Sequence, residues 1–325
     1  MSIDTNRGFA VSVVIPVFNG GAALRRCLDA LCRQQTRHAF EVIVVDDASR
    51  EDLSTLPDEY AQRLALSLIR LEKNSGPGCA RNAGVARATG EIVLFTDSDC
   101  APAADWVEKM LAPFADSQVT GVKGVYISNQ NDLWARLAQL EFEERYEKLA
   151  TCSEIDFIDT YSGAYRKSAF AAAGGFNPEL RQNEDVDLAF RIKASGAKFV
   201  FVPDAVVAHT HREGWRAYAS LKFWRGYWRM RIYRQHLNKA GNDSYTPFSL
   251  KAQLLLLVVL PLTLLSKNAR FLWKSCWLAS CLPLMRSALP DRLLLAVVSP
   301  LFCLVRGLAL LSGMVAGLLA MFRRQ

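Results

Sequence analysis

Several features that mark other classes of protein are missing from this chain of 325 residues. Its eight cysteines form neither a Cys-x-x-Cys pair nor the spacing of a disulfide framework. No secretory signal precedes the first apolar segment, so the part of the chain that carries out chemistry is expected in a reducing cytoplasm. The sequence also shows no repeat of about 20 to 50 residues, which excludes a solenoid or a propeller.

The phosphate-binding signatures of two large enzyme classes are absent as well. The glycine-rich stretch SGPGCARNAG, residues 75–84, lacks the Lys-Ser/Thr pair of a Walker loop and does not match Gly-x-Gly-x-x-Gly. No glycine fingerprint follows the first predicted strand either. These absences argue against a P-loop NTPase and against a Rossmann dehydrogenase.

Acidic residues are scarce in residues 212–239, where the net charge of +7 is concentrated. Eight arginines and lysines in this segment are opposed only by Glu213, and seven aromatic residues lie between them. Such a segment fits nucleic acid, the surface of an anionic membrane, or a solvated basic helix with packed aromatic residues. The apolar sequence that follows favours the membrane, and no nucleic-acid partner is expected.

Short apolar runs and amphipathic segments alternate over the first 100 residues. Apolar runs that end in turn residues are typical of buried strands, and apolar residues at helical spacing indicate the helices between them. The predicted strands are residues 9–17, 40–49, 64–72 and 91–99, and the clearest predicted helices are residues 19–35 and 76–89. This alternation predicts an α/β fold with a doubly wound, mostly parallel sheet and flanking helices.

Four aspartates follow two of these strands, Asp46 and Asp47 after one and Asp97 and Asp99 after the other. Aspartates at strand ends are often turn residues. In a parallel sheet, however, the carboxyl ends of the strands meet at one edge, where ligands bind. Four carboxylates at that edge indicate a site for a cation or for sugar hydroxyls.

The second half of the chain has a different pattern. Residues 132–150 predict a charged amphipathic helix, and residues 157–170 read as strand-like. Residues 183–196 predict a helix whose first turn carries Glu184 and Asp185. Acidic residues at a helix start commonly act only as caps and as partners of the helix dipole, and that interpretation stays open at this point.

The order of motifs resembles the family 2 glycosyltransferases, which are inverting enzymes with the GT-A fold. The matching segments are VSVVIPVFNG, EVIVVDDAS, NSGPGCARNAG, GEIVLFTDSDC, SGAYRKSAFAAAGGFNPEL, NEDVDLAFR and VVAHTHR, and they cover roughly residues 10–215. The resemblance implies the GT-A fold, a nucleotide-sugar donor and a divalent cation, Mg²⁺ or Mn²⁺.

The resemblance also implies roles for residues around the donor. Pro16 is expected to border the nucleotide pocket, Asp47 to hydrogen-bond the base, and Arg81 to lie against the nucleotide. Asp97 and Asp99 match the family's Asp-x-Asp motif. Of these two, Asp97 is implied to contact the ribose or a metal-bound water, and Asp99 to coordinate the cation.

A second set of residues is implied for the acceptor side and for the metal. Asp185 matches the catalytic base, with Glu184 beside it for acceptor binding or orientation. Either His209 or His211 matches a histidine that completes the metal site or touches a phosphate in some members of the family. The motif does not fix which of the two it is.

The C-terminal part of the chain is rich in apolar residues. Its three apolar stretches are residues 251–265, 271–285 and 292–322, the last of which carries Arg306 near its centre. A spanning helix needs about 20 apolar residues, and a charge within it is costly. We expect two membrane crossings, with residues 271–285 at the interface; buried helices of a soluble domain are the alternative.

The predicted organisation is therefore a GT-A catalytic domain over residues 1–211, a basic aromatic juxtamembrane segment over 212–246, and membrane-associated helices over 247–325. The boundary of the apolar part is placed near residues 238–247. The catalytic domain is expected on the cytoplasmic side of the inner membrane. If Arg323 and Arg324 stay on that side as well, the number of crossings is even.

The resemblance and the apolar C-terminus together predict a transferase of the EC 2.4 class. Its reaction would move a sugar from a nucleotide-sugar to a lipid-linked or membrane-embedded acceptor, in cell-surface glycan or glycolipid synthesis. Two alternatives are sugar transfer to a polyprenyl phosphate and a non-catalytic scaffold that binds nucleotide-sugars. The segment after Glu184-Asp185 lacks a Gln-x-x-Arg-Trp signature, which makes a processive polymerase a weaker interpretation.

Overall fold

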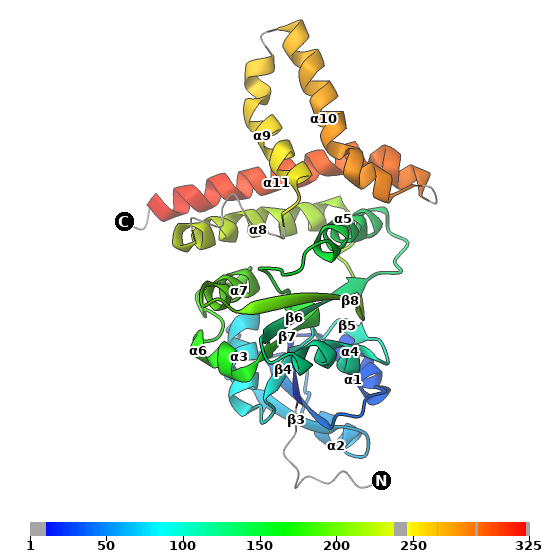
Figure 1. Ribbon diagram of the computed structural model, residues 1–325, viewed down its shortest axis with the longest axis vertical. Coiled ribbons are helices and arrows are strands. Elements are labelled where there is room, and N and C mark those ends of the chain that lie inside the picture. Colours follow the sequence, from blue (N-terminus) through cyan, green and yellow to red (C-terminus); the bar gives the residue numbers. More distant parts are fainter. Residues whose placement is uncertain (1–10, 237–245, 265, 290–291, 323–325) are drawn as a thin grey trace. The chain divides into compact units, whose positions relative to one another are not determined.

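The computed structural model describes residues 11–236, 246–264, 266–289 and 292–322, and it divides the chain into two compact units (Figure 1). The first unit comprises residues 1–127 and 153–209, and the second comprises residues 128–152 and 210–325. Most of the predicted boundary at residues 238–247 lies outside the described residues.

The first unit is built around one sheet of eight strands in the order β3-β2-β1-β4-β7-β6-β8-β5. The strands are β1 (Val11–Val17), β2 (Phe40–Asp46), β3 (Ala65–Arg70), β4 (Ile92–Phe95), β5 (Cys100–Pro102), β6 (Val119–Ile127), β7 (Gly163–Arg166) and β8 (Lys198–His209). Strands β7 and β5 pair antiparallel with their neighbours, and the other pairs are parallel. The predicted α/β fold with a mostly parallel sheet is confirmed.

Helices flank this sheet (Figure 1). They are α1 (Gly21–Cys32), α2 (Leu56–Tyr60), α3 (Pro77–Arg87), α4 (Trp106–Leu111), α6 (Lys167–Ala172) and α7 (Glu184–Ala194). The central strands are continuous runs of buried β-branched and aliphatic residues, as expected for strands covered on both faces. Helix α3 packs closely on β1 and β2, because Gly84 leaves no side chain between it and Val14.

The strand-like interpretation of residues 157–170 was correct for only four residues. Strand β7 covers Gly163–Arg166, a short 3₁₀ helix precedes it at Thr160–Ser162, and α6 follows directly at Lys167. The sequence after Arg166 is rich in alanine, which favours a helix. Before the strand, the side chain of Ser162, the last residue of the 3₁₀ helix, accepts a hydrogen bond from the Trp106 indole at 2.9 Å.

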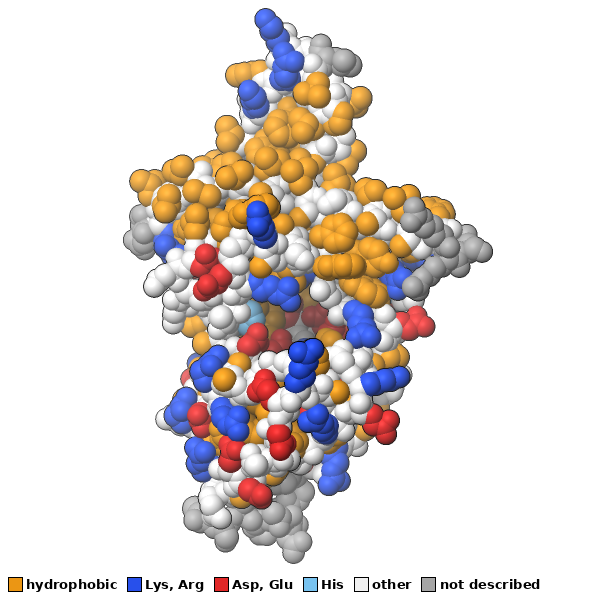
Figure 2. All heavy atoms as spheres, turned by 180° about the vertical axis from the view of Figure 1, so that it is seen from behind, with side chains coloured by type: hydrophobic (Ala, Val, Ile, Leu, Met, Phe, Trp, Pro, Cys, Tyr) orange, Lys and Arg blue, Asp and Glu red, His pale blue; other side chains and the backbone are white. Residues whose placement is uncertain are grey.

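The described part of the second unit consists of helices. They are α5 (Leu133–Ala150), α8 (Trp215–Gln235), α9 (Phe248–Thr263), α10 (Lys267–Ser287) and α11 (Leu293–Phe322). The three apolar stretches thus form α9, α10 and α11. Among the described residues, α11 is the one helix that is long and apolar enough to cross a membrane, judged by length and composition. Hydrophobic side chains gather over the surface of these helices (Figure 2).

Candidate active site at the carboxyl edge of the sheet

Strand β1 lies between β2 and β4, so the chain order reverses there. Such a switch point is where open α/β sheets bind ligands. The pairing of β1 with β4 ends at Val14 and Phe95, and Pro16 lies two residues further along β1. Proline, which has no amide hydrogen to donate, is tolerated here because the backbone of Pro16 points to the side where β4 has ended.

The two aspartates at the end of β2 interact with neighbouring parts of the chain. Asp46 forms an ion pair with Arg70 at 2.9 Å and accepts a hydrogen bond from the Ser49 amide. Asp47 accepts hydrogen bonds from two backbone amides, those of Ser75 at 2.7 Å and Gly76 at 2.8 Å. The expectation that all four aspartates at the sheet edge face a cation or a sugar is therefore wrong for Asp46, whose carboxylate is held by an arginine of the next strand.

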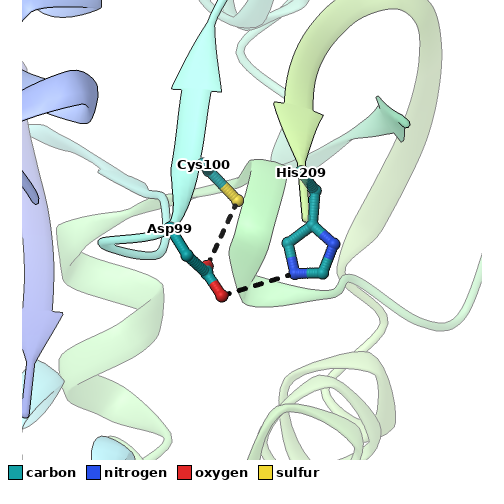
Figure 3. Close-up of side chains that lie close together, drawn as sticks. All are labelled: Asp99, Cys100 and His209. Carbon is teal, nitrogen blue, oxygen red and sulfur yellow. Dashed lines mark hydrogen bonds and ion pairs between the residues drawn. The ribbon is translucent and has the colours of Figure 1, made fainter. Parts of the chain in front are cut away.

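Asp99 lies beside a histidine that is distant in sequence. Strand β5 pairs with β8 in a register that places Cys100 opposite His209. The imidazole Nε2 of His209 is 3.7 Å from Asp99 Oδ2, and the ring stacks on Tyr126 with a centroid distance of 4.7 Å. Figure 3 shows Asp99, Cys100 and His209 turned toward one another, and their ligand atoms lie within 4.8 Å of one another.

The donor atoms of this cluster fit a hard divalent cation. A carboxylate oxygen and an imidazole nitrogen are suitable ligands for Mn²⁺, and carboxylate is the usual protein ligand of Mg²⁺. The third member, Cys100, is a buried thiol whose pKa is raised well above its usual range by burial and by Asp97 and Asp99. A neutral thiol is a poor ligand, so the fit rests on Asp99 and His209.

The second candidate histidine has a different environment. The ring of His211 is buried within the second unit, where its Nε2 lies 3.0 Å from the side-chain oxygen of Gln139. Its ring also stacks on Phe142 with a centroid distance of 6.0 Å. Of the two histidines left open by the sequence, the structure therefore brings His209 to the side of Asp99.

Arg81 bridges two acidic residues, Asp97 and Glu184. It lies on α3 and its side chain is 4% exposed. One guanidinium nitrogen donates to Asp97 Oδ1 at 2.6 Å, and the other terminal nitrogen donates to Glu184 Oε1 at 2.7 Å. Burial alone would lower the pKa of Arg81, but these two carboxylates raise it above its usual value. A fixed cation thus holds together side chains that are 87 positions apart in sequence, at 97 and 184.

Asp185 lies at the start of α7, next to this pair. The preceding Asn183 has a φ of 60°, a left-handed conformation that asparagine tolerates better than most residues. Burial raises the pKa of Asp185 to about 8, with further contributions from Glu184 and Asp159, while Arg81 opposes the shift. A carboxyl group with a pKa this high binds and releases protons near neutral pH, which is suited to general base catalysis.

The structure also places a buried charged pair that sequence analysis missed. Lys123, in the middle of β6, is fully buried and donates to Asp159 and to the Tyr161 hydroxyl, the latter at 2.9 Å. Asp159 is one of the groups that raise the pKa of Asp185. The sequence held one signal, a lone lysine within the apolar run VTGVKGVYI, but its partner could not be identified without the fold.

Comparison with known proteins decides the family. The family model described as "Glycosyl transferase family 2" matches residues 12–174. This chain belongs to glycosyltransferase family 2. The match contains nearly all of β1, the strands β2 to β7, and the aspartates at the ends of β2 and β4, whereas Glu184, Asp185 and His209 lie beyond it. The suspected resemblance is thereby confirmed.

Two curated relatives of this glycosyltransferase chain carry transferase names. It is 32% identical over 222 residues to the pre-mycofactocin glycosyltransferase of Mycobacterium tuberculosis, covering 66% of this chain and 46% of that protein. It is 26% identical over 211 residues to glycosyltransferase AglE of Haloferax volcanii, covering 62% of this chain and 67% of that protein. The chain thus spans about half the length of the first of these relatives.

Solved structures confirm the GT-A fold of this family 2 chain. Mannosyltransferase PcManGT from Pyrobaculum calidifontis, in complex with GDP-Man and Mn²⁺, superimposes with a TM-score of 0.63 at 21% identity and covers 96% of this chain and 88% of that chain. The first 349 residues of TarS from S. aureus, in complex with UDP, give a TM-score of 0.51 at 18% identity, covering 97% and 92%. Both are GT-A glycosyltransferases, and at these identities the likeness concerns the fold.

We expect Arg81→Met to destabilise this glycosyltransferase strongly. The substitution leaves Asp97 and Glu184 without their shared cation, and breaking a buried ion pair costs about 3 kcal/mol or more. Arg87→Met, at an exposed position on the same helix, is the matched control and should change the free energy of unfolding by less than about 0.5 kcal/mol. Denaturant unfolding in detergent measures both; equal stabilities of the two variants would contradict the role given to Arg81.

Proposed function

We propose that the protein is a metal-dependent inverting glycosyltransferase that moves a sugar from a nucleotide-sugar donor to a hydroxyl group of a lipid-linked or membrane-embedded acceptor. The observation that carries the proposal is the arrangement in one unit of Asp99 with His209, and of Arg81 between Asp97 and Glu184, next to Asp185. These side chains supply a cation site and a base at the edge of the sheet where family 2 enzymes hold their substrates.

On the donor side, Pro16 and Asp47 border the nucleotide, and Asp97 contacts the ribose. Asp99 and His209 would hold Mg²⁺ or Mn²⁺, and the cation would supply positive charge toward the leaving diphosphate. Arg81 keeps Asp97 in place through its 2.6 Å hydrogen bond. Because the leaving diphosphate is already an activated group, the chain needs no carboxylic acid to protonate it.

On the acceptor side, Asp185 accepts the proton of the attacking hydroxyl as the new glycosidic bond forms. Attack from the face opposite the diphosphate inverts the anomeric carbon. Glu184 orients the acceptor while its carboxylate is held by Arg81 at 2.7 Å. The base must be ionised to act, so its pKa of about 8 predicts a reaction that accelerates as the pH rises toward that value.

Membrane attachment explains why the acceptor would be a lipid. A nucleotide-sugar is soluble, so an apolar C-terminal part serves the enzyme best when the second substrate lies in the membrane. The exposed apolar residues of α9, α10 and α11 support this assignment. We place the protein at the inner membrane with its catalytic unit in the cytoplasm, where it would take part in cell-surface glycan or glycolipid synthesis.

A second candidate is transfer to a polyprenyl phosphate. It is favoured by one observation, namely that a carboxyl group with a pKa of about 8 is largely protonated at neutral pH. A phosphate acceptor is already an anion and needs no base. The two reactions therefore differ in their dependence on Asp185.

The proposal is tested with detergent-solubilised protein, Mn²⁺ or Mg²⁺, and a panel of UDP-, GDP- and dTDP-sugars, with and without membrane lipid extract. Metal-dependent release of the nucleoside diphosphate that increases at least about tenfold with lipid is the expected result. Product analysis then separates a sugar on a hydroxyl from a sugar on a phosphate. Nucleotide-sugar binding without release from any donor would instead indicate a non-catalytic scaffold.

A further inference from the structure

Helices α8 and α11 lie side by side at a distance that only glycine permits (Figure 1). A Cβ atom on Gly313 would overlap the carbonyl oxygen of Phe223, and one on Gly317 would overlap that of Tyr227. On the other helix, Gly226 meets the backbone of α11 in the same way. Since the contacts advance by four residues along both helices, the two run in the same direction and must share one orientation in any membrane.

Helix α8 is strongly cationic along this contact. It carries five arginines and Lys222 within Trp215–Gln235 and contains no acidic residue. Arg216, Trp224 and Arg234 are exposed on its surface. Arginine and tryptophan side chains exposed together on one helix are typical of the membrane–water interface, where the cations face phosphates and the indole ring lies at headgroup level.

Helix α11 exposes a single apolar stripe. Leu294, Leu301, Leu308, Val315 and Phe322 recur at intervals of seven residues, and each is 48% to 73% exposed. Seven residues are close to two helical turns, so these side chains lie on one face of the helix. A stripe on one face is suited to a helix that rests with that face in the acyl region.

The opposite face of α11 is packed into the protein and contains its charged residue. Arg306 is 1% exposed, donates to the side-chain oxygen of Gln253 at 2.8 Å, and lies 3.9 Å from Glu141. Glu141, on α5, also forms ion pairs with Lys222 and Arg145. Burial alone would raise the pKa of Glu141, but these cations hold it well below its usual range.

We propose that the α8–α11 pair lies along the surface of an anionic bilayer and that α11 does not cross it. The apolar stripe would enter the acyl region, while the exposed arginines and Trp224 of α8 would face the phosphates. If α11 crossed, its close contacts would place α8 and five arginines beside it in the hydrocarbon, where each charge is costly. A nucleic acid fits less well, because it would leave the apolar stripe uncovered.

This inference rests on the membrane association in the proposed function and changes the topology expected from the sequence. The topology expected from the sequence has residues 292–322 as one of two membrane crossings and residues 271–285 at the interface. In the topology proposed from the structure, α11 is the element that lies at the interface. Helix α11 has 30 residues and is therefore about 45 Å long, at 1.5 Å per residue. This length exceeds the bilayer core of about 30 Å, so a helix that crossed perpendicular to the membrane would extend beyond the core.

The test is a depth measurement on the full chain reconstituted in vesicles that contain phosphatidylglycerol. Leu294, Leu308 and Phe322 are replaced one at a time by cysteine and labelled with bimane, in a background where Cys32, Cys79, Cys152 and Cys276 are serine. Quenching by lipids brominated near the headgroup is compared with quenching by lipids brominated deep in the chain. All three positions should be quenched more by the shallow bromines.

A crossing helix gives a different profile, with Leu308 quenched most by the deep bromines and the two ends by the shallow ones. That profile would overturn the proposal, and so would no quenching at any position. The readout needs neither donor nor turnover. A shallow profile in a protein without transferase activity would therefore overturn the proposed function and leave this inference intact.

A second measurement keeps all eight native cysteines and tests the charge on α8. The double variant Arg216→Gln/Arg234→Gln and the native chain are each allowed to partition between vesicles of neutral lipid and vesicles that contain phosphatidylglycerol. Cations near an anionic surface are attracted to it, so removing two of them should lower the preference for anionic vesicles about tenfold or more. Arg33→Gln/Arg87→Gln, two exposed arginines of the first unit, is the control. An equal fall in both double variants would contradict the proposed surface.

Discussion

Replacing Asp185 by asparagine is expected to reduce sugar transfer by about 10³-fold, the typical contribution of a positioned general base, and at the same time to stabilise the folded chain. Asparagine keeps the shape of the protonated carboxyl group but cannot accept the proton of the acceptor. The Arg81 bridge to Asp97 and Glu184 does not involve this side chain, so donor binding should persist.

The gain in stability follows from the direction of the pKa shift. The pKa of Asp185 is raised from 3.8 to about 8 in the folded chain, so the native state holds a proton that the unfolded chain releases. Between about pH 4 and pH 8 the native state therefore loses stability as the pH rises. Asparagine removes this loss, and the free energy of unfolding at pH 7.5 should rise by about 1 to 3 kcal/mol.

Both effects can be measured on one preparation. Transfer is followed by nucleoside diphosphate release, and stability by denaturant unfolding at pH 4.5 and pH 7.5, with the gain expected only at the higher pH. Asp204→Asn, at an exposed position in β8, is the control and should change neither quantity. Transfer that survives in Asp185→Asn would point to the polyprenyl phosphate acceptor, and a stability gain that is equal at both pH values would contradict the raised pKa.

The pH profile offers an independent check on the same group. In the native enzyme, kcat/KM should rise with pH and level off near pH 8, where Asp185 becomes ionised. Glu184→Gln removes a neighbouring negative charge that raises the pKa of Asp185, so the rise should move to lower pH. A pH profile that is the same in Glu184→Gln and in the native enzyme would contradict the contribution of Glu184 to the raised pKa of Asp185.

The parts of this fold that the sequence predicted are those governed by local patterns. Strands β1, β2 and β4 are runs of buried apolar residues that end in turn residues, and such runs identify a buried strand without knowledge of its neighbours. Helices α3 and α7 begin where glycine, proline or acidic residues indicate a start. The same local rules placed Asp97 and Asp99 at a strand end, whereas the role expected for Asp185 came from the family resemblance, because capping also explains an acidic helix start.

The features that escaped prediction depend on contacts between distant segments. The choice between His209 and His211 follows from the register of β5 with β8, which no local pattern encodes. Asp46 and Asp47 are adjacent in sequence, yet only the position of Arg70 on the next strand shows that Asp46 is occupied by an ion pair. Likewise, the sequence alone indicates that Arg306 is a costly charge in an apolar helix, and only the fold shows that it lies near Glu141.

Replacing Asp99 by alanine is expected to reduce metal-dependent nucleoside diphosphate release by at least about 10²-fold. A cation that neutralises a developing charge lowers a barrier by several kcal/mol, and Asp99 is the carboxylate of the proposed site with His209. In the native enzyme, EDTA should abolish release and excess Mn²⁺ should restore it. In Asp99→Ala, added Mn²⁺ should restore little.

The neighbouring residues make this prediction specific. Cys100 follows Asp99 directly, and its thiol lies in the same cluster, 3.9 Å from Asp99 Oδ1. Because burial keeps that thiol neutral, Cys100→Ala should retain metal-dependent release within about threefold of the native rate, whereas His209→Ala should lose about tenfold or more, as is usual when a supporting group of a metal site is removed. If Cys100→Ala lost as much as Asp99→Ala, the metal would be bound through sulfur, and a softer cation such as Zn²⁺ would have to replace Mg²⁺ or Mn²⁺ in the proposed reaction.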